Sequence, residues 1–433
     1  MGKGTQFFDL TEPQTISSLF ASGRSPWEVG LAGAALTATS GPVAPGCGFI
    51  ARPSPSRDAR AVEPDRAYHW PMIDTKGAVW DGTRLIVTDE LQVRGPGAGE
   101  ATVRVLASGI CHSDLNVIDG TSPVASPVVL GHEAAGTVEL VGEGVTSVGP
   151  GDAVVIGSTI PCGDCTACLS GRAGECRNPF GSGQSPFRWL GQPVRAFANV
   201  SSWASMITVA ESQLVPAPGI PPEVAALVGC AVSTGFGVVR NVARVKSGDV
   251  VVVFGVGGIG VNVLQTARLC GASLIIAVDI DKSKEPDAIR FGADVFVAVD
   301  SRDLAETVVD LIRDRTSAEI DVAVECSGSP TAIRSAIQCT AAGGCTALVG
   351  IPPIGAVEAF DVNNLLRNRT IAGSLNGKVD LRRDFPVIIA HIKSGTLDVV
   401  SQVSQVWPLA EIDCAIDAVR AGTVIRAVLD HTA

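Results

Sequence analysis

The segment from Asp249 to Gly350 alternates strictly between short apolar runs and helical patterns. Strands are expected at 250–254, 274–278, 320–325 and 346–350, and helices at 259–269, 304–313 and 331–339. Strands and helices in such rotation form a parallel sheet with crossover helices on its faces. The sequence therefore predicts an α/β fold here. Two further helical patterns (385–394 and 409–419) and a last strand (424–429) follow.

A different pattern precedes this segment. From about Gly77, short β-rich runs at 85–88, 101–105, 134–141 and 152–156 are separated by turns such as Gly95-Pro96-Gly97. Runs of this kind predict an antiparallel, barrel-like domain. A chain of 433 residues has room for two or three domains of roughly 150 residues each.

Residues 1 to about 75 form a third region, which prolines interrupt throughout its second half. These are Pro42, Pro45, Pro53, Pro55, Pro64 and Pro71. A helical pattern is found around residues 14–21, and the region carries no motif. We interpret it as an N-terminal extension whose role the sequence does not reveal.

Acidic residues outnumber basic ones, 44 against 33, which gives a net charge of −11. No stretch gathers five or six basic residues, so no nucleic-acid or membrane partner is expected. The most apolar stretch, 250–264, is broken by glycines, and Asp9 and Glu12 stand where a signal peptide needs an apolar run. With 46% apolar and 18% charged residues, the chain is expected to be a globular cytoplasmic protein.

A glycine-rich turn of the form G-x-G-x-x-G follows the first strand of the alternating segment and opens its helix. Its key residues are Gly255, Gly257, Gly258, Ile259 and Gly260. There, glycines let a pyrophosphate approach the backbone at the positive end of the helix dipole. Asp279 ends the next strand, where a carboxylate bonds a ribose 2′-hydroxyl and repels a 2′-phosphate. The pattern predicts NAD rather than NADP, and the alternative is a tight turn in a sheet without a cofactor.

Four cysteines are clustered, with gaps of two, two and seven residues: Cys162, Cys165, Cys168 and Cys176. Four thiolates so placed close a tetrahedron around Zn²⁺ and exclude water, which indicates a structural zinc site in a reducing compartment. The alternatives are an iron–sulfur cluster, a zinc knuckle on nucleic acid, and unligated buried thiols. The first two fit poorly, because no proline follows Cys176 directly and the basic residues nearby are balanced by acidic ones.

Three further segments carry residue types that bind metals. They are Gly109-Ile110-Cys111-His112-Ser113-Asp114, Gly131-His132-Glu133 and Gly229-Cys230. Their spacing alone does not connect them. Together with the cysteine cluster, the dinucleotide turn and the domain order, they resemble the zinc-containing medium-chain alcohol dehydrogenases. The resemblance is closest to the two-zinc branch with the class I and class III enzymes, and it runs from about residue 77 to the C-terminus.

The resemblance implies a domain arrangement. A GroES-like β-barrel catalytic domain would span 76–231 and carry the structural zinc lobe at about 161–178. A Rossmann-type nucleotide domain would span 232–375, and residues 376–433 would complete the catalytic domain.

The resemblance also implies roles in catalysis. Cys111, His132 and Cys230 match the ligands of a catalytic zinc whose fourth position is open to water or alcohol. Asp114 matches the carboxylate that orients the zinc-bound histidine, and Glu133 matches the acidic residue behind the metal. Ser113 matches the hydroxyl that takes the alcohol proton.

Contacts to the cofactor are implied in the same way. His112 and Arg426 match cations at the pyrophosphate, Lys284 matches a ribose contact, and Thr234 matches a neighbour of the nicotinamide. For His112, Lys284 and Arg426 the alternative is an ordinary solvated side chain.

The sequence departs from the family pattern at several positions. Asn116 stands where many relatives have the histidine that passes the proton to solvent. Ser158 stands where class I enzymes have a large aromatic residue, and the segment 176–197 is abbreviated, so a wide substrate pocket is expected. Pro286 lies in the helix after Asp279, which is therefore expected to start late.

The sequence thus predicts a zinc-dependent oxidoreductase with two zinc ions per chain. It would transfer a hydride between NAD(H) and an alcohol or aldehyde of broad or bulky type. A formaldehyde dehydrogenase acting on a glutathione or mycothiol adduct shares every motif, and a biosynthetic aldehyde reductase is a further alternative. A non-catalytic binding protein on this scaffold would have lost a ligand, but all three catalytic ligands are present. A homodimer or homotetramer is expected.

Overall fold

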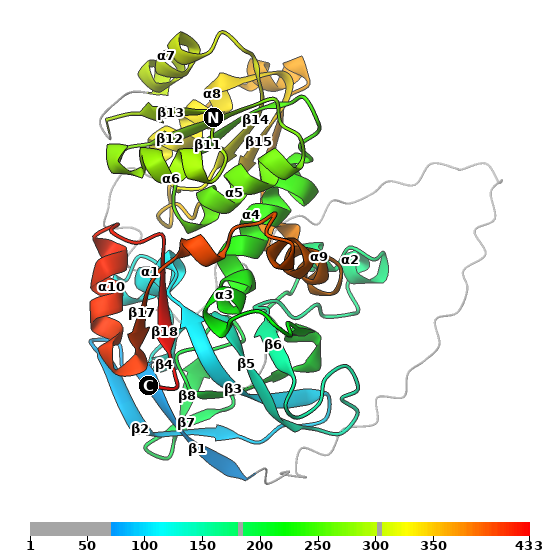
Figure 1. The fold of residues 1–433 in the computed structure, drawn as a ribbon, viewed down its shortest axis with the longest axis vertical. Helices are drawn as coiled ribbons and strands as arrows, with labels where there is room; N and C mark the ends of the chain where they lie inside the picture. The colour runs from blue at the N-terminus through cyan, green and yellow to red at the C-terminus, as the bar shows by residue number, and fades with distance from the viewer. Residues whose placement is uncertain (1–70, 181–184, 301–304) are drawn as a thin grey trace, which may run out of the picture. The chain divides into compact units, whose positions relative to one another are not determined.

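Six parallel strands form the sheet of the nucleotide domain (Figure 1). The computed structural model describes residues 71–180, 185–300 and 305–433, so the N-terminal extension and its helical pattern at 14–21 lie outside the described residues. The sheet has the order β13-β12-β11-β14-β15-β16. Its strands are β11 Val250–Phe254, β12 Leu274–Asp279, β13 Val295–Ala298, β14 Ile320–Glu325, β15 Thr340–Leu348 and β16 Thr370–Gly373. This order is that of a doubly wound sheet, which binds ligands beyond the carboxyl ends of its strands.

The predicted parallel sheet is confirmed, with differences at its margins. β11, β12 and β14 match the expected strands because their apolar residues are buried on both faces of the sheet. The expected strand 346–350 is wrong at both ends. β15 begins at Thr340, directly after a helix, because an irregularity in the pairing lets Thr340 lie opposite Ile320 while Cys345 lies opposite Val322. β13 and β16 were not predicted, because strands of four residues are too short to show an apolar pattern in the sequence.

Four helices connect these strands: α5 Gly258–Leu269, α6 Glu285–Arg290, α7 Ala305–Arg315 and α8 Pro330–Cys339. The three predicted helices are confirmed, and so is the late start after Asp279. A 3-10 turn, Lys282–Lys284, precedes α6, and Pro286 lies in the first turn of α6. The first turn tolerates proline because its N–H groups have no partner within the helix.

The other domain contains a closed barrel of order β1-β2-β7-β8-β4. Its strands are β1 Met72–Trp80, β2 Leu85–Arg94, β4 Val128–Val129, β7 Phe187–Trp189 and β8 Gln192–Ala196. β1 begins ahead of residue 76, because Met72 already pairs with Arg94 at the end of β2. The expected barrel-like architecture is therefore present.

A larger sheet packs beside this barrel, in the order β10-β6-β5-β3-β18-β17, with β9 also paired to β3. Its strands are β3 Glu100–Gly109, β5 Glu133–Val141, β6 Ala153–Ile156, β9 Met206–Ala210, β10 Leu214–Pro216, β17 Val403–Pro408 and β18 Arg426–Asp430. The last two come from the end of the chain: β18 pairs with β3, and β17 pairs with β18 (Figure 1). The final strand thus starts at Arg426, two residues later than the predicted 424.

Helices α9 Leu381–Lys393 and α10 Ile412–Arg420 confirm the two predicted C-terminal helices. α9 begins earlier than the expected residue 385, because the carboxylate of Asp380 caps it by accepting the N–H of Arg382. Pro386, near the expected start, therefore lies inside the helix.

One long apolar helix, Pro222–Ala243, was not predicted. It consists of α3 Pro222–Leu227, the π-helical turn η4 Val228–Val232, α4 Ser233–Gly237 and a second π-helical segment, η5 Val238–Ala243. Among the described residues this helix alone is long and apolar enough to cross a membrane. However, 89% of its apolar 18-residue stretch is buried inside the protein. A helix that is apolar on all sides lacks the periodicity by which a surface helix is detected in a sequence.

Candidate metal centre and nucleotide site

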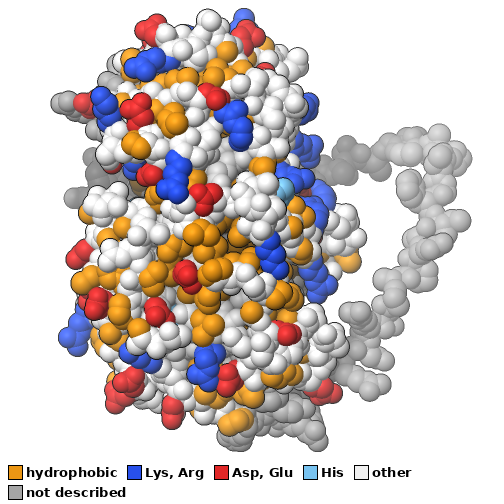
Figure 2. Space-filling model, viewed as in Figure 1, with side chains coloured by type: hydrophobic (Ala, Val, Ile, Leu, Met, Phe, Trp, Pro, Cys, Tyr) orange, Lys and Arg blue, Asp and Glu red, His pale blue; other side chains and the backbone are white. Residues whose placement is uncertain are grey.

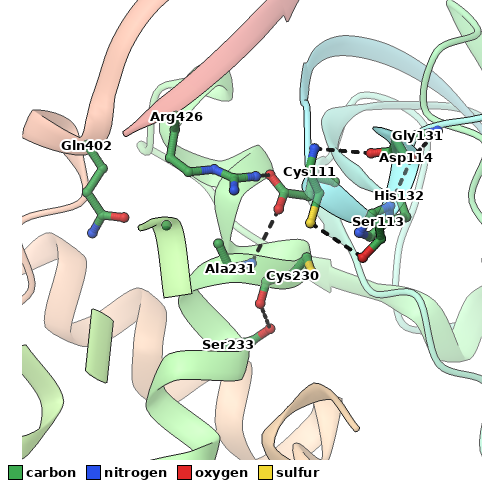
Figure 3. A network of polar contacts seen from close by, with 12 residues as sticks. Cys111, Ser113, Asp114, Gly131, His132, Cys230, Ala231, Ser233, Gln402 and Arg426 are labelled. Carbon is green, nitrogen blue, oxygen red and sulfur yellow. Dashed lines mark hydrogen bonds and ion pairs between the residues drawn. The ribbon is translucent and has the colours of Figure 1, made fainter. Parts of the chain in front are cut away.

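Four side chains from distant parts of the chain meet in one buried cluster: Cys111, His132, Glu133 and Cys230. One donor atom from each lies within 4.8 Å of the others. Cys111 caps helix α1 His112–Ile118, His132 and Glu133 lie at the start of β5, and Cys230 belongs to the turn η4. The tertiary structure therefore brings together the three predicted ligands, and the nearby Glu133 with them (Figure 3).

Asp114 fixes the orientation of His132. Its fully buried carboxylate accepts the N–H groups of Cys111 at 3.1 Å and Gly131 at 2.9 Å, and it lies 3.2 Å from Nδ1 of His132. An imidazole held through Nδ1 leaves Nε2 for a metal ion. Phe197, which sequence reasoning missed, packs edge-on against the ring, with the centroids 5.6 Å apart.

Cys230 takes its position from the π-helical turn η4. Such widened turns occur often at functional sites, because they redirect a side chain without ending the helix. Gly229 is needed beside it, since a Cβ atom there would lie 2.8 Å from the carbonyl oxygen of Ile156. Ser233 donates to the carbonyl of Cys230 at 3.1 Å and ties the turn to α4.

The close packing of the donors shifts their proton affinities in opposite directions. The hydrogen bond between the two thiols lowers the pKa of Cys111 well below its usual value and raises that of Cys230. Burial opposes protonation of His132, but Asp114 outweighs burial, with help from Cys111, and raises the pKa of the ring. Two thiols and one imidazole form a donor set that zinc prefers, and binding zinc would release their protons.

Glu133, whose carboxylate lies among the donors, forms a buried ion pair with Arg426. Burial raises the pKa of Glu133 although Arg426 opposes this shift. The other oxygen of Glu133 accepts the N–H of Ala231 at 3.3 Å. Gly109 must lack a side chain, because a Cβ atom there would lie 1.9 Å from a Glu133 oxygen.

Arg426 also reaches the nucleotide turn. A Cβ atom on Gly258 would lie 2.7 Å from its Nη1, so guanidinium and turn are in direct contact. Its Nε is buried without a hydrogen-bond partner among the described residues. An unpaired buried donor beside a glycine turn at a helix N-terminus fits an anionic ligand such as a pyrophosphate.

The turn itself has the geometry that a dinucleotide requires. Gly255 has a φ of +93°, and a Cβ atom on Gly260 would lie 1.9 Å from the Gly255 carbonyl oxygen. Asp279, at the end of β12, accepts the N–H of Val256 at 2.7 Å and lies 3.2 Å from Nζ of Lys284. Two predicted ribose contacts, Asp279 and Lys284, are thus side by side.

The remaining predicted residues lie nearby in the fold. Thr234 is buried on α4. The hydroxyl oxygen of Ser113 lies 3.7 Å from the sulfur of Cys111. His112, at the first residue of α1, is exposed. Asn116 lies one helical turn after Ser113, and its carbonyl accepts the N–H of Ser122 at 2.8 Å.

Sequence reasoning missed an amide pair that joins the domains. Asn262 of α5 and Gln402 before β17 are both fully buried and exchange two hydrogen bonds of 2.8 and 2.9 Å. Asn262 also donates to the carbonyl of Gly258 at 2.7 Å. The signal available in the sequence was Asn262 itself, a polar residue within the otherwise apolar run 250–264.

The four predicted lobe cysteines, Cys162, Cys165, Cys168 and Cys176, also form one cluster, with one sulfur from each within 4.8 Å of the others. Helix α2 Thr166–Leu169 carries Cys168, and Cys165 caps it. The sulfur of Cys176 accepts N–H groups from Cys162 at 3.3 Å and Asn178 at 3.4 Å. Backbone N–H groups lower the pKa of Cys165 to about 6, whereas a hydrogen bond to Asp164 raises the pKa of Cys162 to about 12. Four thiols so close together form the donor set of a closed zinc site.

The fold and these two sites define a zinc-binding oxidoreductase that uses a nucleotide cofactor. The family model for the alcohol dehydrogenase GroES-like domain matches residues 97–219, and that for zinc-binding dehydrogenases matches residues 258–394. The chain therefore contains both halves of that architecture.

Individual proteins similar to this chain are also alcohol dehydrogenases. The chain is 34% identical over 373 residues to the class-3 alcohol dehydrogenase of Dictyostelium discoideum, which covers 83% of this chain and 98% of the relative. A zinc-binding alcohol dehydrogenase domain protein from Burkholderia ambifaria is similar in structure, with 33% identity and a TM-score of 0.77, covering 83% of this chain and 99% of that chain. The benzyl alcohol dehydrogenase of Acinetobacter calcoaceticus has 30% identity and a TM-score of 0.75 over the same shares.

The chain belongs to the zinc-containing alcohol dehydrogenase family and is a zinc-dependent alcohol oxidoreductase. The predicted resemblance, the fold class and the enzymatic nature are confirmed. Its substrates are small-molecule alcohols or aldehydes.

Replacing one cysteine in each cluster should separate the two sites. We expect Cys168→Ser to lower both metal content and melting temperature, because a site with three ligands leaves the lobe without its closure. We expect Cys230→Ser to lose activity and metal from the other site while it largely keeps its melting temperature, since the buried helix around it remains packed. Metal analysis and calorimetry of both variants measure this. Equal destabilisation would contradict the division into structural and catalytic sites.

Proposed function

We propose that this chain is an NAD(H)-dependent alcohol dehydrogenase with two zinc ions. Cys111, His132 and Cys230 would hold the catalytic zinc, and the four lobe cysteines the structural one. The observation that supports this most is the buried meeting of two thiols and an oriented imidazole beside the nucleotide turn. A reducing, cytoplasmic location suits the free thiols, since every described cysteine is unpaired.

Zinc, when bound, polarises the substrate oxygen and makes the alcohol more acidic. Asp114 keeps the imidazole of His132 in the tautomer that can bind the metal. Ser113 accepts the substrate proton at its hydroxyl, which lies beside Cys111. Arg426 would contact the pyrophosphate and Glu133 would lie beside the metal, and the two side chains are paired and buried.

We infer that bulky alcohols, benzylic ones among them, are the substrates. Ser158 replaces a large aromatic residue, and its hydroxyl is held by Asn376 at 2.8 Å while its carbonyl is held by Asn199 at 3.2 Å. By the resemblance to class I enzymes this position borders the substrate pocket, where a small side chain would leave room for a bulky alcohol. The similarity to a benzyl alcohol dehydrogenase supports the same choice. The class-3 relative supports a thiol-adduct formaldehyde dehydrogenase as the second candidate.

A substrate panel followed by NADH absorbance tests this proposal. We expect benzylic alcohols to give a kcat/KM at least about tenfold above ethanol, the effect of roughly 1.4 kcal/mol of extra binding to the transition state. Formaldehyde should be oxidised no faster when glutathione or mycothiol is added. A rate that requires either thiol would establish the second candidate instead.

Asp279 should decide the choice of cofactor. Removing its carboxylate in Asp279→Ser takes away both the hydrogen bonds to the ribose 2′-hydroxyl and the repulsion of a 2′-phosphate. We expect the ratio of kcat/KM for NAD over NADP to fall by at least about tenfold, or roughly 1.4 kcal/mol. Wild-type enzyme that uses NADP as well as NAD would refute this role.

Asn116 should make alcohol oxidation depend on pH. With no histidine there, Ser113 must pass the proton directly to water, so oxidation should be slow near pH 7 and rise with pH. Asn116→His should raise the rate near pH 7 by up to about tenfold, a conservative share of the effect of a general base. Single-turnover oxidation between about pH 6 and 9 measures this. A wild-type rate that is independent of pH would show that another group completes the relay.

We propose that two copies pair through the edge strand β16, as expected for a homodimer or half of a homotetramer. β16 ends the parallel sheet, and the segment around it exposes large apolar side chains, among them Ile354, Val357 and Leu366 at 74%, 88% and 79% exposure. Unpaired edges and apolar patches of this kind mark interfaces, and a two-fold axis satisfies both copies at once. Sedimentation equilibrium measures the mass, and a monomer would refute the pairing.

A further inference from the structure

A pocket of about 490 Å³ lies at the end of the long apolar helix, away from the metal centre. It is lined by the end of η5, the C-terminal half of α5 and one side chain of α9. Ten residues of helix separate Cys230 from Arg240, which corresponds to roughly 15 Å. The volume is in the range of pockets that bind small molecules.

This pocket is separate from the nucleotide site. Ser247, in its wall, precedes strand β11, whereas the glycine turn follows that strand at Gly255. The five residues of β11 span roughly 16 Å, so the two sites lie at opposite edges of the sheet. A cofactor bound at the turn would leave the pocket free.

Positive charge gathers in the pocket wall, and Asp249 contacts the wall from outside by accepting the backbone N–H of Lys246 at 2.8 Å. Arg240, Arg244 and Lys246 all line the pocket and all are exposed, and no acidic side chain lines it. Within the described ranges none of these three cations forms an ion pair, whereas Arg268 and Arg383 pair with Asp294 and Asp384 at 2.6 and 2.7 Å. Figure 2 shows lysine and arginine side chains gathering at the right-hand edge, at the level of α9. In a chain with a net charge of −11, such a cluster is unusual.

The surrounding structure positions one of these side chains and the backbone of a second. The guanidinium of Arg240 lies over the ring of Phe236, 5.1 Å from its centroid, and that ring lies 6.2 Å from the ring of His391. Arg244 ends the helix in the left-handed conformation, with φ +54°. The helix carbonyls at this end carry about half a negative charge, which leaves most of the positive charge of three cations uncompensated.

We propose that this pocket binds a small phosphorylated molecule. Arginine forks bind phosphate oxygens in pairs, and Lys246 and the Ser247 hydroxyl supply further donors. A phosphate monoester offers three anionic oxygens and a charge near −2, which matches three cations better than a single carboxylate does. The apolar part of the wall, with Phe236, would receive the body of the ligand.

Calorimetry with ribose 5-phosphate tests the proposal, with excess NADH present so that the nucleotide turn is filled. A parallel titration with inorganic phosphate measures how strongly the phosphate group alone is bound. A titration with ribose is the control without charge. The informative variant is Arg244→Asn with Lys246→Gln, because asparagine tolerates the left-handed conformation and the Arg240–Phe236 contact stays intact. The matched control is Arg188→Gln with Arg195→Gln, two exposed arginines on β7 and β8 that change the net charge equally.

We expect wild type and the control to bind ribose 5-phosphate alike, ribose not at all, and the pocket variant at least about tenfold more weakly, a loss of roughly 1.4 kcal/mol. An unchanged melting temperature of the pocket variant would confirm that only binding is affected. Should that variant fail to fold, Lys246→Gln alone gives the same comparison. Equal binding by wild type and the pocket variant, or no binding of either phosphate by wild type, overturns the proposal.

Discussion

The buried ion pair between Glu133 and Arg426 connects the metal centre to the nucleotide turn. Glu133 lies among the donor atoms of the cluster, and Arg426 lies against Gly258. Removing one partner from a buried pair costs roughly 3–5 kcal/mol, because the other charge is left unpaired. Two glycines make the arrangement sterically possible, since side chains at Gly109 or Gly258 would overlap with the pair. The donor cluster and the nucleotide turn are therefore connected through one ion pair.

The apolar helix Pro222–Ala243 is the second element that joins the two domains. Its π-helical turn presents Cys230, the next turns bury Thr234, and its last residues carry Arg240. The amide pair of Asn262 and Gln402 anchors the neighbouring helix α5 to the segment before β17. Buried, mutually satisfied polar pairs of this kind restrict the choice of packing more than apolar contacts do.

Much of the fold could be predicted from local patterns. The parallel sheet, the late helix at Pro286 and the two C-terminal helices follow from periodicity, proline positions and buried apolar runs. Boundaries that depend on tertiary pairing were missed, such as the start of β15 at Thr340, which is set by its partner strand β14. The long apolar helix was missed because burial on all sides removes the periodicity on which detection depends.

For the site, the spaced lobe cysteines, the glycine turn and the carboxylate that ends β12 are local features that the sequence by itself determined. The roles of Cys111, His132 and Cys230 came only from the resemblance to a family. The sequence did not determine which distant segments meet. Cys111, His132 and Cys230 lie on separate elements, and only the packing of β3, β5 and the π-helical turn brings their donor atoms within 4.8 Å of one another. The ion pair of Glu133 with Arg426 and the unpaired cations around Phe236 likewise exist only in the folded chain. The physical reason is that spacing along a chain fixes local geometry, whereas contacts between distant residues depend on how complete elements pack.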